Sequence, residues 1–298
     1  MGILGGAMLS SNPAFRGALL ALAAGTMFSF GGITVRLSPS LDSFQYILWR
    51  CVGLVPLILA INAWRGTSPL RQVAASGWLG LGGGLCLTAS GVLFIFAMKA
   101  TTIANALLFA SGAPLLGALL ARIILKEKIG TITWSAIALG ALGLVVMTGS
   151  ELGAGNSVGN LAAVGSAVAY ALYSILARIG RGRDMSGAVT SYSLLTAGIS
   201  LGIVLANGAT LATPMVENVM AMVHGAIFIG GGIVFFNLAA RLVRAGQLTL
   251  LAQTETVLGP LWVFLIFAER PRVATIVGGA VILAGVMLAA WGEARRSA

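Results

Sequence analysis

Long runs of apolar residues alternate with short polar links along the whole chain. A bilayer core of ~30 Å requires about 20 apolar residues in a helix, and ten segments reach or approach that length. The links are too short to hold a soluble domain, and they contain turn residues such as Pro39, Pro69 and Pro214. The pattern predicts an all-α integral membrane protein with ten transmembrane helices. They are expected near residues 17–36, 43–63, 77–97, 102–124, 131–149, 159–178, 187–206, 218–240, 247–267 and 273–291.

The composition agrees with this class. Of the 298 residues, 58% are hydrophobic and 9% are charged, whereas about a quarter of a soluble domain is charged. A net charge of +10 would suggest nucleic acid as the partner of a soluble protein. Here the basic residues lie in links between apolar segments, so no nucleic-acid partner is expected. Cys51 and Cys86 lie within apolar segments and are interpreted as small buried residues, not as a disulfide or a metal pair.

The distribution of Lys and Arg predicts the orientation in the membrane. With a cytoplasmic N-terminus, thirteen of the 18 basic residues lie on the cytoplasmic side and four on the other, while Arg50 lies inside the second segment. Arg16 is interpreted as the flank of a first, uncleaved helix rather than of a signal peptide. We therefore expect a multi-pass protein of the cell (inner) membrane with both termini in the cytoplasm.

The second half of the chain overlays the first without a gap when it is shifted by 142 positions. Charged residues are scarce, so a register that aligns several of them is not expected by chance. Five segments per repeat is an odd number, so the repeats at 17–149 and 159–292 should insert in opposite orientations. Inverted repeats recur in carriers that work by alternating access. The aligned pairs include Gly17–Gly159, Phe28–Tyr170, Arg36–Arg178, Lys99–Arg241, Gly117–Gly259 and Glu127–Glu269.

Two motifs, one in each repeat, carry a family resemblance. Residues 98–106 (MKATTIANA) lead to Pro114 and then to residues 126–128 (KEK). Residues 253–261 (QTETVLGPL) lead to residues 268–271 (AERP), and the last segment contains a glycine-rich run at residues 278–285. In this order the sequence resembles the drug/metabolite transporter superfamily, and within it the EamA type of ten-helix permeases. One departure is Thr256 at the position equivalent to Pro114, with Pro260 following four residues later.

This resemblance implies two inverted five-helix repeats around a central substrate cavity. It also implies a secondary transporter that exports small organic solutes, with amino acids and related metabolites as the favoured class. The expected partners are the solute and membrane lipid, with protons as a candidate coupling ion and no cofactor. Proton-coupled efflux of drugs or toxic compounds is the main alternative.

Other classes of function find less support in the residues. A channel would require a ring of charges or a carbonyl filter, and neither is recognisable. A membrane enzyme would need a nucleophile–base pair or a metal cluster, but the chain has one histidine, two separated cysteines and no HExxH motif. The chain is therefore not expected to be an enzyme. It also lacks a GxxxxGK[ST] run, so ATP is not expected to drive it directly.

Glu255 is the acid expected deepest inside a helix. A carboxylate in hydrocarbon costs about 2.5–3.5 kcal/mol on insertion scales, so it should face protein or water. It is a candidate for taking up a proton or holding a cationic group. The alternative is a structural carboxyl, because the small residues Ala252 and Gly259 share its face and indicate a close helix contact. Glu127 and Glu269 follow segment ends and are interpreted as cap or interface charges.

Two further residues have alternative interpretations. Arg50 follows Trp49 in the second segment, and its side chain is long enough to reach the outer interface. It is also a candidate to bind a substrate carboxylate. His224 is the only histidine, and its imidazole suits proton transfer, although a lone histidine in a helix is commonly a packing residue. It is expected too far from Glu255 for direct contact.

The remaining candidates are aromatic and polar residues in the middle of segments. Such residues line cavities for amphipathic solutes, although many aromatic side chains in membrane helices face lipid or pack. These candidates are Phe28, Ser111, Tyr170, Tyr173, Gln253 and Trp262. Helix bending is expected near two prolines and one glycine run, because proline removes a backbone hydrogen bond and glycine is permissive. The hinge candidates are Pro114, Pro260 and Gly231.

Overall fold

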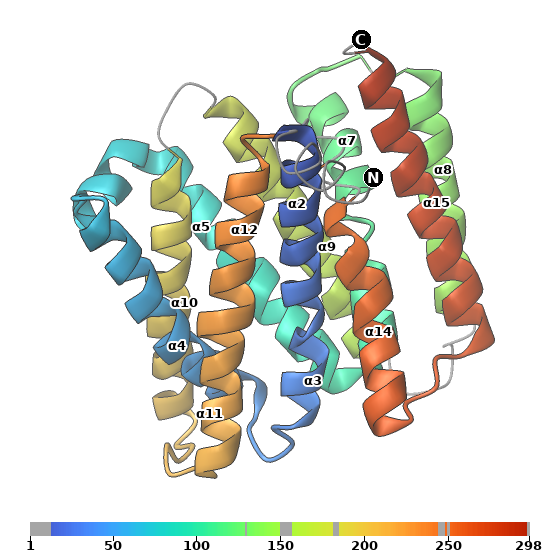
Figure 1. Ribbon diagram of the computed structural model, residues 1–298. Coiled ribbons are helices and arrows are strands. Elements are labelled where there is room, and N and C mark those ends of the chain that lie inside the picture. The colour runs from blue at the N-terminus through green and yellow to red at the C-terminus, as the bar shows by residue number, and fades with distance from the viewer. Residues whose placement is uncertain are drawn as a thin grey trace, which may run out of the picture.

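The computed structural model describes residues 13–128, 130–149, 157–180, 185–243, 248 and 251–296, and these residues form a helical bundle without strands (Figure 1). The first half contains α2 (Pro13–Ser29), α3 (Gly31–Arg36), α4 (Ser43–Trp64), α5 (Pro69–Ala100), α6 (Ile103–Ala110), α7 (Ala113–Ile124) and α8 (Thr131–Gly149). The second half contains α9 (Ser157–Ile179), α10 (Ser186–Ala206), α11 (Met215–Val223), the π-helix η1 (His224–Gly231), α12 (Gly232–Ala239), α14 (Thr254–Phe267) and α15 (Val273–Arg296).

Helices occur at all ten positions expected from the hydrophobic pattern. Eight of them are long and apolar enough to cross a membrane, and this confirms the all-α membrane class. The apolar helices Thr131–Met147 and Thr254–Phe267 are shorter. The prediction of ten spanning helices is thus confirmed for eight. The ninth was expected over 247–267, and its residues 247, 249 and 250 lie outside the described part of the chain.

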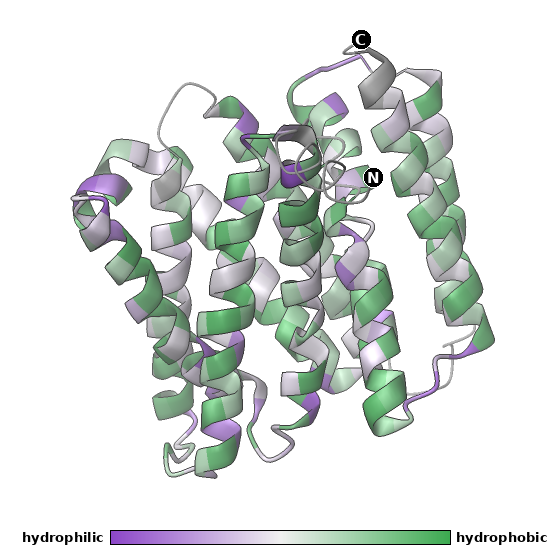
Figure 2. Cartoon of the chain, viewed as in Figure 1, coloured by the Kyte–Doolittle hydropathy of each residue, from purple (hydrophilic) through white to green (hydrophobic). Residues whose placement is uncertain are grey.

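The bundle has two ends that differ in what they contain. The helix α2 begins and α15 finishes at the same end, at the top of Figure 1, and we call this the terminal end. The helices α3 and α14 finish at the opposite end, which we call the distal end. Figure 2 shows hydrophobic residues along the lengths of the helices, with many hydrophilic residues near helix ends. The largest buried apolar cluster includes Tyr46, Met98, Phe109 and Val263 and joins helices of both halves.

Three helices are interrupted where a Ser or Thr hydroxyl bonds to the backbone. Ser29 donates to the Thr26 carbonyl at 2.6 Å just before α3 begins. Ser111 donates to the Leu108 carbonyl at 2.7 Å between α6 and α7. Thr254 donates to the Leu251 carbonyl at 2.6 Å where α14 begins. Such local bonds compete with the helical ladder, and they accompany these three interruptions.

The ninth segment differs from the expectation because of this third interruption. It was expected as one helix with Glu255 near the middle, but residue 253 is a turn and Glu255 lies in the first turn of α14. Pro260 lies inside α14, which remains helical across it. In the first half, Pro114 stands at the start of α7, directly after the interruption. Gly231 is the last residue of η1.

The two halves pack against each other in an exchanged pattern. The helix α5 of the first half packs against α9 and α10, while the run α11–η1–α12 of the second half packs against α2 and α4. The helices α8 and α15 pack side by side. The helix α10 also contacts α4. Helices of one half are therefore supported mainly by helices of the other.

Single contacts repeat in the same way, 142 positions apart. A Cβ at Gly17 would overlap Leu242 and Val243, and a Cβ at Gly159 would overlap Ala100 and Thr101, the positions equivalent to 242 and 243. Both glycines therefore allow the same close helix approach, with the halves exchanged.

Candidate functional site

A stack of three aromatic rings lies where α2 meets α3, between η1 and α14. Phe30, at the junction of α2 and α3, stacks on Phe228 of η1 with ring centroids 4.9 Å apart. It also stacks on Trp262 of α14, at 5.7 Å and an interplanar angle of 8°. The indole Nε1 of Trp262 donates to Ser29 Oγ at 3.0 Å, which fixes the ring. Trp262 was a candidate from the sequence, whereas Phe30 and Phe228 were not identified.

His224 belongs to a buried chain of hydrogen bonds beside this stack. Its Nδ1 lies 2.6 Å from the Tyr46 hydroxyl, which in turn donates to Thr34 Oγ1 at 2.8 Å. His224 is 2% exposed. The Lys99 ammonium lies 5.5 Å from the centre of the Tyr46 ring, and it donates to two backbone carbonyls, those of Ser38 and Leu41. The imidazole therefore has a fixed partner, as a packing histidine does.

An ion pair with several additional hydrogen bonds connects three elements at the distal end. Arg36 Nε donates to Glu269 Oε2 at 2.8 Å, and Glu269 Oε1 accepts from the Ile103 backbone N–H at 2.9 Å. Arg36 also donates to the Thr101 carbonyl at 3.3 Å. The bonds join α3, the end of α14 and the start of α6. Glu269 is thus an interface charge.

A polar cluster extends this connection. The Thr101 hydroxyl donates to Asn160 Oδ1 at 2.9 Å, and the Thr275 hydroxyl donates to Asn105 Oδ1 at 2.8 Å. Asn105 Nδ2 lies 3.4 Å from Asn160 Oδ1. These residues come from α6, α9, α15 and the link before α6, so side chains of both halves meet here.

The terminal end carries the equivalent ion pair in a simpler setting. Arg178 Nη1 donates to Glu127 Oε2 at 3.0 Å. The side chains are 34% and 50% exposed, compared with 29% and 21% for Arg36 and Glu269. Glu127, like Glu269, therefore connects the two halves.

Glu255 of α14 lies near Tyr170 of α9, and both residues belong to the second half of the chain. It lies close enough to Tyr170 for an electrostatic interaction, and Tyr170 and Tyr173 form a tilted pair with centroids 5.9 Å apart. Tyr170 is 43% exposed and Glu255 is half-buried. Within the described part of the chain, the Glu255 carboxylate has no hydrogen bond or ion pair. Three sequence candidates are therefore brought together here, with an acid beside two aromatic rings.

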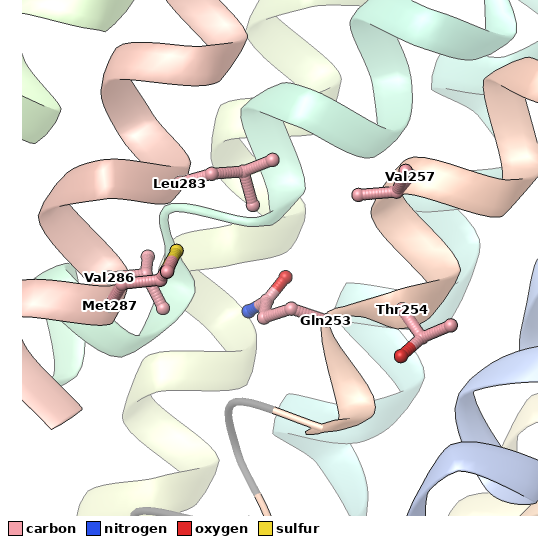
Figure 3. A pocket seen from close by; sticks show the side chains of 6 residues that line it. All are labelled: Gln253, Thr254, Val257, Leu283, Val286 and Met287. Carbon is pink, nitrogen blue, oxygen red and sulfur yellow. The ribbon is translucent and has the colours of Figure 1, made fainter.

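Gln253 and Thr254 line a pocket of about 210 Å³ between α14 and α15. Figure 3 shows the Gln253 side chain pointing into it, opposite Leu283, Val286 and Met287. Gln253 Oε1 also accepts from the Thr256 hydroxyl at 2.9 Å. The break at residue 253 thus places a polar group beside an apolar helix face.

Ser111, Phe28 and Arg50 lie elsewhere. Ser111 is buried and bonds to its own helix. Phe28 packs against α12, where a Cβ at Gly232 would overlap its ring. The interpretation of Arg50 as a side chain that reaches the outer interface is wrong, because Arg50 is 2% exposed and donates from Nη2 to the Tyr192 hydroxyl at 3.2 Å. The described residues contain no cluster of three or more His, Cys, Asp or Glu side chains that could hold a metal.

The fold and these contacts define a multi-pass helical membrane protein whose two halves meet through equivalent residues. Residues 15–149 and residues 157–291 each match the EamA-like transporter family, and the chain belongs to that family.

Two similar proteins can be compared with it. A protein described as "Uncharacterized transporter" from Vibrio cholerae serotype O1 (strain ATCC 39315 / El Tor Inaba N16961) is 27% identical over 165 residues. The alignment covers 54% of this chain and 53% of that relative, so the chain spans about half the length of the curated relative it matches. A structure described as "Crystal structure of protein" has a TM-score of 0.67 at 20% identity, with 92% of this chain and 96% of that chain covered. This last likeness concerns the fold.

Proposed function

We propose that the chain is a secondary transporter that carries small organic solutes across the cell membrane by alternating access. The observation that supports this most directly is the exchanged pair of ion pairs. Arg36–Glu269 lies at the distal end, and Arg178–Glu127, 142 positions away, lies at the terminal end. A two-fold axis in the membrane plane relates two such contacts, and it makes the repeats inverted. Two equivalent closures at opposite ends are what alternating access requires.

In this proposal the structure is closed at its distal end. The stack of Phe30, Phe228 and Trp262 and the multiply bonded Arg36–Glu269 pair close the path there. The exposed Tyr170 and the half-buried Glu255 are then reached from the terminal end. With both termini in the cytoplasm of an inner-membrane protein, the terminal end faces the cytoplasm, and the more exposed Arg178–Glu127 pair is the weaker of the two closures.

The class of solute rests on the family. Amino acids and related metabolites are the proposed substrates, and export is the proposed direction. The aromatic side chains of Tyr170 and Tyr173 and the acid Glu255 together suit a small amphipathic molecule. The curated relative is described as a transporter without a named substrate, in agreement with the broad class.

Counterflow in proteoliposomes tests the transport function. Vesicles containing the purified protein are loaded with one unlabelled amino acid at a time, and entry of the same labelled amino acid is followed. Saturable, protein-dependent accumulation that other amino acids inhibit supports a carrier. Entry that grows linearly with concentration, or recovery of a chemically altered solute, contradicts it.

Proton coupling through Glu255 is a second, narrower hypothesis. The carboxylate lies beside Tyr170, and acids inside membrane helices commonly mark functional sites. We expect Glu255→Gln to remove the dependence of transport on a pH gradient while the protein still exchanges solute. Glu217→Gln is the control, because Glu217 is an acid of α11 at the distal end that accepts from the Ser40 N–H. Unchanged gradient dependence in Glu255→Gln excludes this residue as the coupling group.

A further inference from the structure

Arg50 lies within α4 and is enclosed by three neighbouring elements. A Cβ at Gly91 of α5 would stand 3.3 Å from Arg50 Nη2. A Cβ at Gly225 of η1 would overlap the Arg50 carbonyl oxygen, and Tyr192 of α10 covers a third side. The small residues let the helices close around the side chain, which is why it is buried and not at the interface.

The guanidinium has no carboxylate partner among the described residues. Nη2 donates to the Tyr192 hydroxyl, and the buried Nε has no hydrogen-bond partner. The side chains near enough for electrostatic interaction are neutral ones, those of Tyr46, Cys51, Tyr192 and His224. The acids whose side chains the structure describes all lie against other groups: Asp42, Glu127, Glu217, Glu255 and Glu269.

Arg50 cannot relieve its unpaired positive charge by losing a proton, since guanidinium stays charged in proteins. A buried charge without a counter-ion is strongly unfavourable, and more so within a membrane. The partner that completes such a site is an anion. A further sign is that η1, which begins at His224 beside this site, is a π-helix, and π-helical turns frequently occur at functional sites.

Arg50 and Tyr192 are also equivalent positions of the two repeats. They are 142 residues apart, the same shift that aligns the halves, and their side chains touch. Two equivalent residues can touch each other only where the repeats meet on their common axis. In a carrier of the proposed kind, a site on that axis is equally close to both ends.

We propose that Arg50 and the Tyr192 hydroxyl bind the anionic group of the transported solute, a carboxylate. The identity of the solute rests on the proposed transport function, whereas the need for an anion rests on the contacts alone. The planar guanidinium donates two parallel hydrogen bonds to the carboxylate, one of them from the unpartnered Nε, and the phenol adds a third donor. The helices around Arg50 separate to admit the solute. An inorganic anion such as chloride has the same chemistry, and the experiment distinguishes the two.

Thermal unfolding of the purified full-length protein tests binding. The probes are the standard amino acids, their C-terminal amides, and sodium chloride with sucrose as osmotic control. We expect at least one amino acid to raise the apparent Tm of the native protein while its amide does not. The shift disappears in Arg50→Gln and shrinks in Arg50→Lys, which keeps the charge without the planar fork. Arg122→Gln, which removes an exposed arginine at the end of α7, keeps the shift.

The same measurement separates binding from a purely structural role. Because the unpaired charge is unfavourable, Arg50→Gln without any probe is expected to melt no lower than the native protein. A lower Tm combined with unchanged probe shifts makes Arg50 structural and overturns the proposal. A shift with chloride that Arg50→Gln loses, without any shift from amino acids, supports the anion site but assigns it to an inorganic ion. If no probe produces a Tm shift that depends on Arg50, the proposal is overturned.

Transport kinetics distinguish this proposal from the transport function itself. For a solute with a carboxylate, Arg50→Gln is expected to raise KM by about 10- to 100-fold, the usual value of a hydrogen bond to a charged group. Tyr192→Phe is expected to raise it less. If the native protein transports and Arg50→Gln keeps its KM, the anion site is wrong and the transport function stands. If binding depends on Arg50 but no solute crosses the bilayer, the transport function is wrong and the anion site stands.

Discussion

The two ends of the bundle carry equivalent ion pairs whose surroundings differ. At the distal end, Glu269 bonds to both Arg36 and the Ile103 N–H. At the terminal end, the Glu127 carboxylate bonds to Arg178 alone among the described residues, and half of the side chain is exposed. The repeat thus places the same ion pair at both ends, and the surrounding contacts determine the stability of each pair.

The aromatic stack strengthens the contrast. The positions equivalent to Phe30, Trp262 and Phe228 in the other repeat are Leu172, Leu120 and Cys86. Ring stacking adds about 0.5–1.5 kcal/mol per pair beyond simple burial. Only the distal half has this contribution at these positions. In the alternating-access cycle that we propose, this difference favours the state that is closed at the distal end.

Covalent linkage of the distal pair is expected to have the largest effect. With Cys51→Ser and Cys86→Ser as background, Arg36→Cys with Glu269→Cys is treated with a bifunctional thiol reagent. If the distal end must open in each cycle, crosslinking reduces counterflow to the level of empty vesicles. A reductant-cleavable reagent allows recovery. Full transport by protein that is shown to be crosslinked contradicts the gating role.

The linked terminal pair gives the matching test. Arg178→Cys with Glu127→Cys is also expected to stop transport when crosslinked. Because that pair is more exposed, the native equilibrium should present it in the closed geometry less often. We therefore expect its crosslinking to be slower under identical conditions, measured as the mobility shift on a denaturing gel. Equal crosslinking rates at the two ends would contradict the proposed difference in stability between the two ion pairs.

Neutralising the two glutamates is expected to have unequal effects on stability. Glu269→Gln weakens a pair that is also bonded to a backbone N–H, and it should cost about 1.5–3 kcal/mol. Glu127→Gln affects a more exposed pair and should cost about 0–1 kcal/mol. Denaturant unfolding in mild detergent measures both. The control is the double variant Arg36→Glu with Glu269→Arg, in which the two charges are exchanged. It should recover part of the free energy of unfolding that Glu269→Gln loses.

The smallest expected effect comes from the stack. Trp262→Leu gives the distal end the residue found at position 120, and it should weaken that closure by about 0.5–1.5 kcal/mol. The state open at the terminal end then becomes about 2- to 10-fold less favoured. A Tyr170→Cys reporter, in the background without native cysteines, should react correspondingly more slowly with an impermeant thiol reagent from the terminal side. A faster reaction would show that the stack does not favour this state.

The sequence predicts the membrane class and the register of the repeats, because apolar run lengths and scarce charges are local signals. The shift of 142 positions pairs Arg36 with Arg178 and Glu127 with Glu269. It does not show that each arginine bonds to the glutamate of the other repeat. That information lies in how the helices pack, which periodicity does not encode.

The candidate site could be predicted only in part for the same reason. Glu255 and Tyr170 were identified as single residues, and the interruption at residue 253 was not expected, because Thr256 stands where the first repeat has Pro114. Arg50 was expected at the interface because its reach was considered without the glycines that enclose it. Phe30 and Phe228 carry no distinctive signal, since phenylalanine is ordinary in an apolar helix.

The contact between Arg50 and Tyr192 also bears on how such a chain can arise. In a homodimer of two identical five-helix units, this position would place one arginine against a second arginine, and the like charges would repel. Joining the units into one polypeptide lets a single copy change to tyrosine, so that a lone cation remains at the centre. Duplication followed by fusion thus permits an arrangement that two separate, identical subunits could not hold.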